Sequence, residues 1–333
     1  MKRFPAYPAL VALLMTTSFA GCRQDPLPES GSPIRFSVAQ AVISAETTKA
    51  DNGKPHGEEY LKQTTVPVRL YGSYAGSTTP LFDGIELFCT NVSSNVWAYS
   101  PLRYWAQSGT HSFRAVFPFK DSGQSYDAGS DKLNITFSMA DSYDLMVASA
   151  EQDAATRTSD LVELPFKHAC AAVRFLYSKT SEDTQSYSIK ELKLQNMQTT
   201  GTLTYTGVAG TTAASMSWTS GTRVAAAYTW TASTSDPALD VDTENKMFKD
   251  WFYVVPQALN AVGTTPAPTV LLLKYMAGDQ EMSATLDLNE VTADHQWEVG
   301  CAYTYTILVN PKVIGLTVSY ESWNPVGNNL TAD

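Results

Sequence analysis

The sequence predicts an all-β protein that folds as two consecutive β-sandwich domains, with mostly antiparallel strands and few short helices. Apolar and polar residues alternate in about a dozen short segments, and Ser, Thr, Gly and Asp dominate the connections between them. No long stretch has the 3.6-residue period of an amphipathic helix. With 333 residues, 44% of them hydrophobic, the chain is long enough to fill two cores. We therefore expect domains at residues 34–160 and 161–333.

Residues 1–21 have the organisation of a signal peptide. Two basic residues precede an apolar run that ends at Ala20, too short for the roughly 20 apolar residues that cross a bilayer. Gly21 and Ala20 are small enough for a signal peptidase to reach the bond before Cys22. We predict that Cys22 is lipidated and holds the protein at a membrane through its acyl chains, such as palmitate. An ordinary secretory leader with a chance cysteine is the alternative.

The segment after Cys22 is expected to be an extended spacer. Residues 22–33 contain three prolines and no apolar periodicity. Loss of the leader removes Lys2 and Arg3, which leaves 21 basic and 33 acidic residues and a net charge of −12. This balance argues against a nucleic-acid partner.

The first domain begins with strand patterns. Apolar residues alternate from Val66 to Leu70, and Pro67 suggests an edge strand because proline donates no ladder hydrogen bond. Asp83-Gly84 lies between apolar flanks and predicts a two-residue hairpin turn. Further strands are expected at residues 96–99, 113–117 and 144–148.

The second domain continues the same pattern from Leu161. Strands are expected around residues 173–177, 188–194, 251–255 and 270–275. The last two are the clearest, with alternation over residues 303–309 and 314–320 and a turn at Asn310-Pro311-Lys312.

No pattern indicates catalysis, a metal site or a cofactor site, so we expect a protein that is not an enzyme and holds no cofactor. The four histidines are far apart, and no nucleophile elbow or phosphate-binding loop is present. Two aspartate sets leave calcium binding open beside solvated loops: residues 121, 127 and 131, and residues 236, 240 and 242. Cys89, Cys170 and Cys301 are an odd number, so at least one is unpaired after export.

Aromatic residues offer one binding alternative. Trp97, Tyr99, Tyr104 and Trp105 cluster in the sequence, where core positions compete with a surface that stacks on sugar rings. A surface glycan-binding lipoprotein would have Trp97, Trp105 or Trp218 in solvent as a platform. An enzyme would instead need a cleft with converging carboxylates or a nucleophile and base.

Several segments, in order, resemble the fimbrillin family of Bacteroidetes outer-membrane lipoproteins, in particular its Mfa-like branch. The resemblance covers nearly the whole chain after the leader. The segments are Ile34-Arg35-Phe36, Thr47-Thr48-Lys49-Ala50, Val68 to Ala75, Trp97 to Trp105, Leu145 to Ala148, Leu164 to Ala169, Val254 to Gln257, Trp297 to Tyr305 and Ser322-Trp323-Asn324.

The resemblance implies transthyretin-like sandwiches and a structural, tip or anchor subunit of a fimbria, or pilus, on the outer membrane. Family members lose their first strand to a protease, and a strand from a neighbouring subunit fills the groove. Here the exchanged strand would be residues 34–43, with Ile34, Phe36 and Val38 on one face. Processing would fall near Lys49, where the family often has arginine.

The donor strand would come from residues 313–320, with Ile314, Leu316, Val318 and Tyr320 alternating. The partners implied are other fimbrial subunits, the outer membrane through the lipid and, for a tip subunit, a surface glycan or protein.

Overall fold

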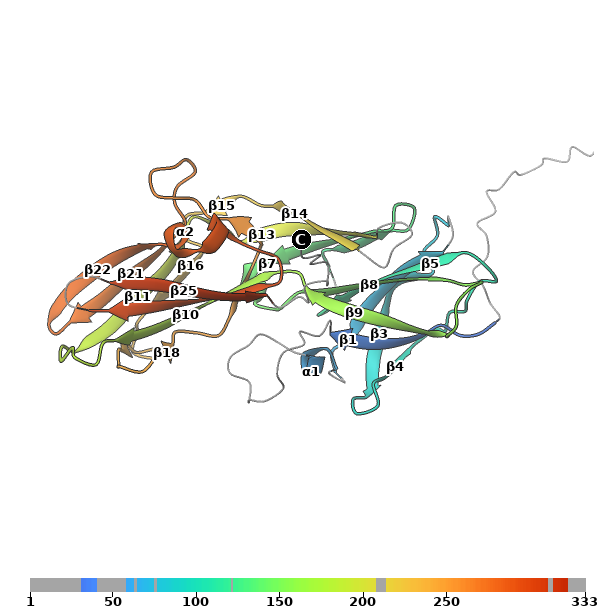
Figure 1. Ribbon diagram of the computed structural model, residues 1–333, viewed down its shortest axis with the longest axis horizontal. Coiled ribbons are helices and arrows are strands. Elements are labelled where there is room, and N and C mark those ends of the chain that lie inside the picture. The colour runs from blue at the N-terminus through green and yellow to red at the C-terminus, as the bar shows by residue number, and fades with distance from the viewer. Residues whose placement is uncertain are drawn as a thin grey trace, which may run out of the picture.

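The computed structural model describes residues 31–40, 58–62, 65–74, 77–120, 122–207, 214–310 and 314–322. They form an elongated molecule of two β-rich lobes placed end to end (Figure 1). The helices are single turns: α1 (Glu58–Leu61), α2 (Leu288–Val291), and the 3-10 turns η1 (Met139–Asp141) and η2 (Ala293–His295). The prediction of an all-β fold with few short helices is confirmed. No helix of the described residues is long and apolar enough to cross a membrane.

The N-terminal lobe is built on a seven-stranded sheet. Its strands, in spatial order, are β1 (Arg35–Gln40), β9 (Leu161–His168), β8 (Met146–Asp153), β5 (Thr110–Phe117), β2 (Val68–Tyr74), β3 (Phe82–Asn91) and β4 (Val96–Tyr99). One face of this sheet encloses a core rich in phenylalanine, to which Phe36, Phe82, Phe113 and Phe166 contribute. Leu61 of α1 is buried in the same core.

The opposite face of the seven-stranded sheet is covered by a second sheet. Its order is β14 (Ala214–Ser220), β13 (Thr200–Gly207), β7 (Lys132–Ser138) and β6 (Gln124–Asp127). Val116 and Val147 of the first sheet share a buried cluster with Ile135 and Leu203 of the second. Residues from both halves of the chain therefore build this sandwich, and β13 and β14 lie beside the lobe junction in Figure 1.

A buried arginine lies between these two sheets. Arg114 is fully buried, its Nη1 donates to the Phe113 carbonyl at 2.7 Å, and its Nη2 pairs with Asp131 and lies 3.5 Å from Glu151 Oε1. Burial raises the pKa of both carboxyl groups. At Gly207 a Cβ would stand 1.6 Å from Nη2, so the close approach of β13 requires glycine there.

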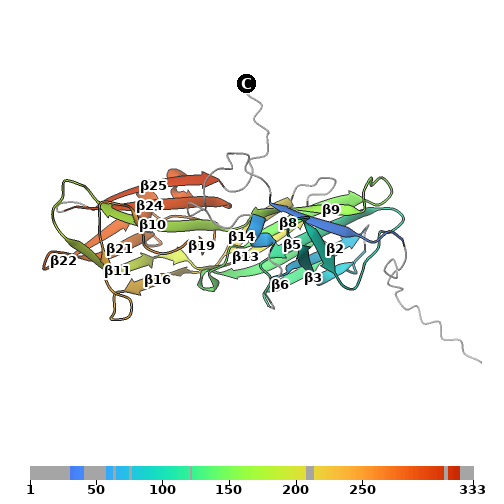
Figure 2. The ribbon, with the colours of Figure 1, turned by 90° about the horizontal axis from the view of Figure 1, so that it is seen from below.

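The C-terminal lobe packs two further sheets on one core. The first contains β18 (Lys246–Met247), β10 (Ala171–Lys179), β24 (Cys301–Val309) and β25 (Gly315–Ser322), with β19 (Phe252–Val254) also on β10. The second contains β16 (Tyr228–Thr231), β11 (Tyr187–Gln195), β21 (Val270–Ala277) and β22 (Gln280–Asp287), with β17 (Leu239–Asp240) on β11. Figure 2 shows β24 and β25 together along one side of this lobe.

Two small ribbons complete the described strands. They pair β12 (Met197–Gln198) with β15 (Arg223–Val224), and β20 (Gln257–Ala258) with β23 (Gln296–Trp297). Among the described strands, β1 with β9 and β10 with β24 are parallel pairs, and all other pairs are antiparallel. The prediction of mostly antiparallel pairing is confirmed.

Two local predictions were wrong. Pro67 precedes β2, so it removes no ladder donor, and β2 lies inside the sheet between β5 and β3. Asp83-Gly84 makes no hairpin turn, because β3 continues through both residues. Gly84 has φ +67° at a register shift, where β2 pairs Leu70 with Ile85 and Tyr71 with Asp83. The glycine supplies the left-handed residue of a β-bulge instead.

The strand expected to open the second domain belongs to the first sheet. β9 begins at Leu161, pairs with β8 and with β1, and ends at His168. The chain enters the C-terminal lobe with β10, while β13 returns to pair with β7. The division into residues 34–160 and 161–333 stays a prediction, and these pairings favour a crossing near Ala169 instead.

Candidate functional site

β1 is the outermost strand of the seven-stranded sheet, and both of its edges are held. The Arg35 N–H donates to the Asp160 carbonyl at 2.9 Å, so odd-numbered residues of β1 carry the parallel ladder to β9. Even-numbered residues direct their main-chain groups to the opposite side. There the Ile34 N–H donates to the Arg103 carbonyl at 2.9 Å.

The side chains of β1 and the residue before it point into the core of the N-terminal lobe. Ile34, Phe36 and Val38 are 0%, 3% and 0% exposed. The Phe36 ring makes edge contacts with Phe82, Tyr99 and Phe113 at centroid distances of 5.5, 5.7 and 5.3 Å. This first strand is therefore a structural part of the core, despite its place at the edge of the sheet.

The far edge of β1 faces β4 across a groove of about 540 Å³, the seam groove. Its lining residues are Pro33 to Phe36, Ser94 to Tyr99, Leu102 and Leu161. Val96, Leu102 and Leu161 are about half exposed, so the groove has an apolar rim. No ladder joins the two strands. Two side-chain hydrogen bonds cross the seam, from Asn95 Nδ2 to the Val38 carbonyl (3.0 Å) and from the Tyr99 hydroxyl to the Ile34 carbonyl (2.8 Å).

β25, the segment expected to act as a donor, is an edge strand of the C-terminal lobe. It pairs with β24 from Cys301–Ser322 to Leu308–Gly315. Ile314, Leu316 and Val318 are only partly buried against the core. Tyr320 is 54% exposed and stacks on Tyr303 with a centroid distance of 5.8 Å.

Two further predicted sites, Cys22 and Lys49, lie outside the described residues. The predictions of lipidation at Cys22 and processing at Lys49 therefore stay predictions. The same is true of residues 41–43 of the expected first strand and of Pro311 and Lys312 in the last turn.

The tryptophans do not form a platform in solvent. Trp97 and Trp105 are buried, and Trp218 is half-buried with its indole N–H donating to the Ala169 carbonyl at 3.0 Å. Trp97 Nε1 likewise donates to Asn95 Oδ1 at 2.7 Å. Trp97 and Trp105 belong to the core of the N-terminal lobe, and Trp218 packs against the buried cluster between its two sheets.

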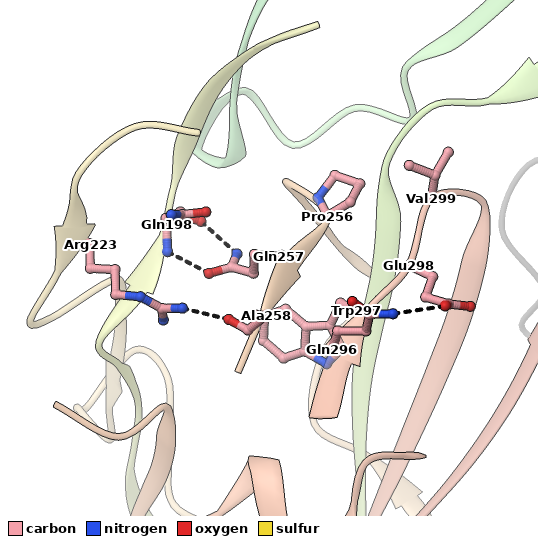
Figure 3. Close-up of a pocket in the computed structure, with 9 residues that line it drawn as sticks. All are labelled: Gln198, Arg223, Pro256, Gln257, Ala258, Gln296, Trp297, Glu298 and Val299. Atoms are coloured by element: carbon pink, nitrogen blue, oxygen red, sulfur yellow. Dashed lines mark hydrogen bonds between the residues drawn. The ribbon is translucent and has the colours of Figure 1, made fainter. Parts of the chain in front are cut away.

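A polar pocket of about 500 Å³ lies between the two small ribbons (Figure 3). The Gln257 side chain accepts from the Gln198 N–H at 2.8 Å and donates to the Gln198 carbonyl at 3.0 Å. Arg223 donates to the Asn196 carbonyl at 2.7 Å and to Thr269 Oγ1 at 3.0 Å. Arg223 also donates to the Ala258 carbonyl, so the hydrogen bonds of Gln257 and Arg223 join β12 and β15 to β20.

The residues weighed for metal binding are dispersed or paired in other ways. Within the described ranges, no group of three His, Cys, Asp or Glu side chains is placed to hold a metal ion. Asp131 pairs with Arg114, and Asp242 lies 3.6 Å from the Lys246 Nζ. His168 Nδ1 lies 2.9 Å from Asp144 in a buried pair. Cys89, Cys170 and Cys301 are free and buried.

The family model for fimbrillin-like proteins matches residues 63–323. The chain belongs to the fimbrillin-like family. The predicted resemblance is confirmed, and family membership supports a structural, non-enzymatic role as a pilus subunit at the cell surface. No curated protein matches the chain.

Two solved structures share the overall fold of this fimbrillin-like chain. One is a protein assigned to cell adhesion from Bacteroides uniformis, with 17% identity and a TM-score of 0.51, covering 87% of this chain and 99% of that one. The other is a fimbrial protein from Bacteroides vulgatus, with 14% identity and a TM-score of 0.51, also covering 87% and 99%. At this identity the likeness concerns the fold alone.

Sequence reasoning missed two residues that hold β1 in this fimbrillin-like chain, Asn95 and Arg103. Their partners on the first strand are remote in the chain; Asn95 reaches across 57 positions to Val38. The local cue was the polar stretch before Val96, which predicts a turn but gives no partner.

Proposed function

We propose that this protein is exported as a lipoprotein, is anchored through Cys22, and becomes a pilus subunit when its first strand is exchanged for a strand of a neighbouring subunit. The observation that carries the proposal is the position of β1. It is an edge strand with buried side chains, and residues 41–57 separate it from α1. Cleavage at Lys49 would detach β1 without cutting any described helix or strand.

Loss of β1 would expose apolar surface and main-chain groups that a replacement strand could cover. Burial of each side chain the size of Ile34, Phe36 or Val38 contributes about 1.5–3 kcal/mol. The emptied slot would also expose the ladder groups of β9. A strand with apolar residues at alternate positions can fill the apolar site and also pair with β9. This is the physical basis of β-augmentation.

The C-terminal segment is the proposed donor. Ile314, Leu316 and Val318 have the required alternation, and their partial burial on an outer strand lowers the cost of leaving their own lobe. A donor from one subunit and a slot on the next make a head-to-tail contact, and such contacts build open filaments.

The experiment compares two chains made without the lipid, one lacking residues 1–49 and a control that starts at Gly31 and keeps β1. We expect the trimmed chain to associate with itself or with fimbrial subunits from the same organism, measured by size-exclusion chromatography with light scattering. The control should stay monomeric. Circular dichroism checks that both are folded, and a folded trimmed chain that stays monomeric with every subunit tested refutes strand exchange.

Mass spectrometry of the protein from its native membrane tests the anchor and the processing together. A mature chain that begins with acylated Cys22 identifies an anchored subunit. A chain that begins after Lys49 identifies an assembled subunit that has lost both the lipid and β1. A Lys49→Ala variant should prevent the second product, because the cleaved bond follows a basic residue. A chain that begins at neither place contradicts the proposal.

A further inference from the structure

We infer that Asn95 and Tyr99 form a latch that determines which strand can occupy the slot between β9 and β4. The inference rests on the proposed function only where it names the incoming strand as one from another subunit. Its basis is the seam groove, where no ladder joins β1 and β4. Asn95, in the turn before β4, and Tyr99, on β4, instead donate side-chain hydrogen bonds to β1 and the residue before it.

The backbone conformation of Asn95 and its contact with Trp97 orient its side-chain amide toward β1. It has φ +52°, a left-handed conformation that asparagine tolerates better than most residues. Trp97 Nε1 donates to Asn95 Oδ1 at 2.7 Å, which fixes the orientation of the amide because only its oxygen can accept that bond. Asn95 Nδ2 is therefore directed to the Val38 carbonyl, 3.0 Å away.

Neighbouring residues also orient the Tyr99 hydroxyl toward the first strand. The Arg103 N–H lies 3.3 Å from the Tyr99 hydroxyl oxygen, and that hydroxyl donates to the Ile34 carbonyl at 2.8 Å. The Tyr99 ring also contacts the ring of Phe36, the residue between the two carbonyls. A phenol with the ordinary pKa of 10 is protonated at neutral pH, and burial raises the pKa of Tyr99 further.

Together the latch residues contact main-chain carbonyls four residues apart on the side of the strand that faces away from β9. A strand that runs in the direction and register of β1 satisfies both hydrogen bonds. An aromatic residue midway between the two carbonyls then packs against Phe82, Tyr99 and Phe113, as Phe36 does. An antiparallel strand, or one shifted by one residue, turns the wrong carbonyls to the latch. The seam groove leaves this edge of β1 accessible to an incoming segment.

The test uses the full chain and two substitutions that each remove one donor. Asn95→Asp keeps the acceptor for Trp97 but cannot donate to Val38 at neutral pH. Tyr99→Phe keeps the ring against Phe36 and loses only the hydroxyl. The matched controls are Asn91→Asp, which preserves the oxygen that accepts from the Ser94 N–H, and Tyr74→Phe, whose ring stacks on His111 from a strand that does not pair with β1.

Hydrogen exchange measured by mass spectrometry reports the release of β1. We expect exchange of the Ser37 and Ala39 amides to be about fivefold faster in each latch variant, as for loss of one hydrogen bond, and unchanged in the controls. Exchange in β10 and β24 should not change, which separates local release from global unfolding. Unchanged exchange at β1 in both latch variants would overturn the inference.

A labelled synthetic peptide of residues 31–43 tests the choice of strand. The peptide should enter the full-length latch variants faster than the wild-type chain, and a peptide with Phe36→Ala should enter more slowly than the parent peptide. Equal entry of the parent peptide into the wild-type chain and the latch variants contradicts the latch. If exchange and peptide entry respond as expected but the trimmed chain never associates, the latch stands and the proposed strand exchange between subunits fails.

Discussion

The two strands that frame this protein, β1 near its start and β25 near its end, are both edge strands with alternating apolar residues, yet their environments differ. The apolar side chains of β1 are inside a core of aromatic rings, and the strand is held by β9 on one side and by Asn95 and Tyr99 on the other. Those of β25 lie on the margin of their core, with one ladder and with Tyr320 largely in solvent.

The difference shows that edge position does not measure how strongly a strand is held. β1 contributes one wall of a core, so its slot needs an occupant at all times. β25 covers a core that β10 and β24 already close. In an assembly by strand exchange, the site of β1 suits an acceptor slot and β25 suits a donor. The reason is that β25 gives up less buried apolar surface when it leaves its own lobe.

The largest expected effect comes from truncating one aromatic residue on each strand. Phe36→Ala should lower the free energy of unfolding of the N-terminal lobe by about 3–5 kcal/mol, because it empties a buried site between three rings. Tyr320→Ala should cost under about 1 kcal/mol, because the side chain is mostly exposed. Urea unfolding measures both, and similar losses would remove the contrast between the strands.

A matched pair of valines gives a smaller effect with identical chemistry. Val38→Ala should cost about 2 kcal/mol, since two buried methyl groups are lost, whereas Val318→Ala should cost about half as much or less. Chemical denaturation of the full chain, followed by tryptophan fluorescence, provides the comparison. A larger loss at Val318 would identify β25 as the more strongly held strand.

Alkaline pH should lower the stability of the N-terminal lobe through Tyr99, which holds β1. Burial raises the pKa of this phenol above its ordinary value of 10, so the folded state keeps a proton that the unfolded state loses. Stability therefore falls as the pH rises above 10, and it is fully present below that value. The decline between pH 9 and pH 11 should be smaller in Tyr99→Phe than in wild type, measured by urea unfolding; an equal decline would mean that Tyr99 does not contribute.

A substitution that crowds the buried Arg114 provides a reference outside both strands. Gly207→Ala places a methyl group against Arg114, so we expect it to destabilise the packing of β13 on the N-terminal sheet by about 1–3 kcal/mol. Hydrogen exchange in β13 and β7 should rise while exchange in β1 stays unchanged. Faster exchange in β1 as well would show that the slot depends on the sheet behind it.

Alternation in the sequence was sufficient to predict many strands. The prediction of residues 96–99 matches β4, and those of residues 303–309 and 314–320 match the hairpin of β24 and β25 to within two residues at each end. The pattern failed where the same dipeptide is compatible with two local structures. Asp83-Gly84 can close a hairpin or form a bulge, and the pairing of β2 along β3 decides between them.

The seam groove could be predicted only in part. Ile34, Phe36 and Val38 were expected on one face of a strand, and all three are buried together. The parallel pairing with β9 and the hydrogen bonds from Asn95 and Tyr99 were not expected. They depend on a sheet that brings its first and last strands close together, and no short-range pattern encodes that closure.

By itself, the sequence determined the fold class, the order of many strands and the family, because these depend on local alternation and on short motifs along the chain. The tertiary structure decided which strands are neighbours. It placed β9 with the first lobe, covered that lobe with β13 and β14, and positioned Asn95 and Tyr99 against β1. These pairings join residues far apart in the chain, and they are selected by the burial of complementary surfaces rather than by any local preference.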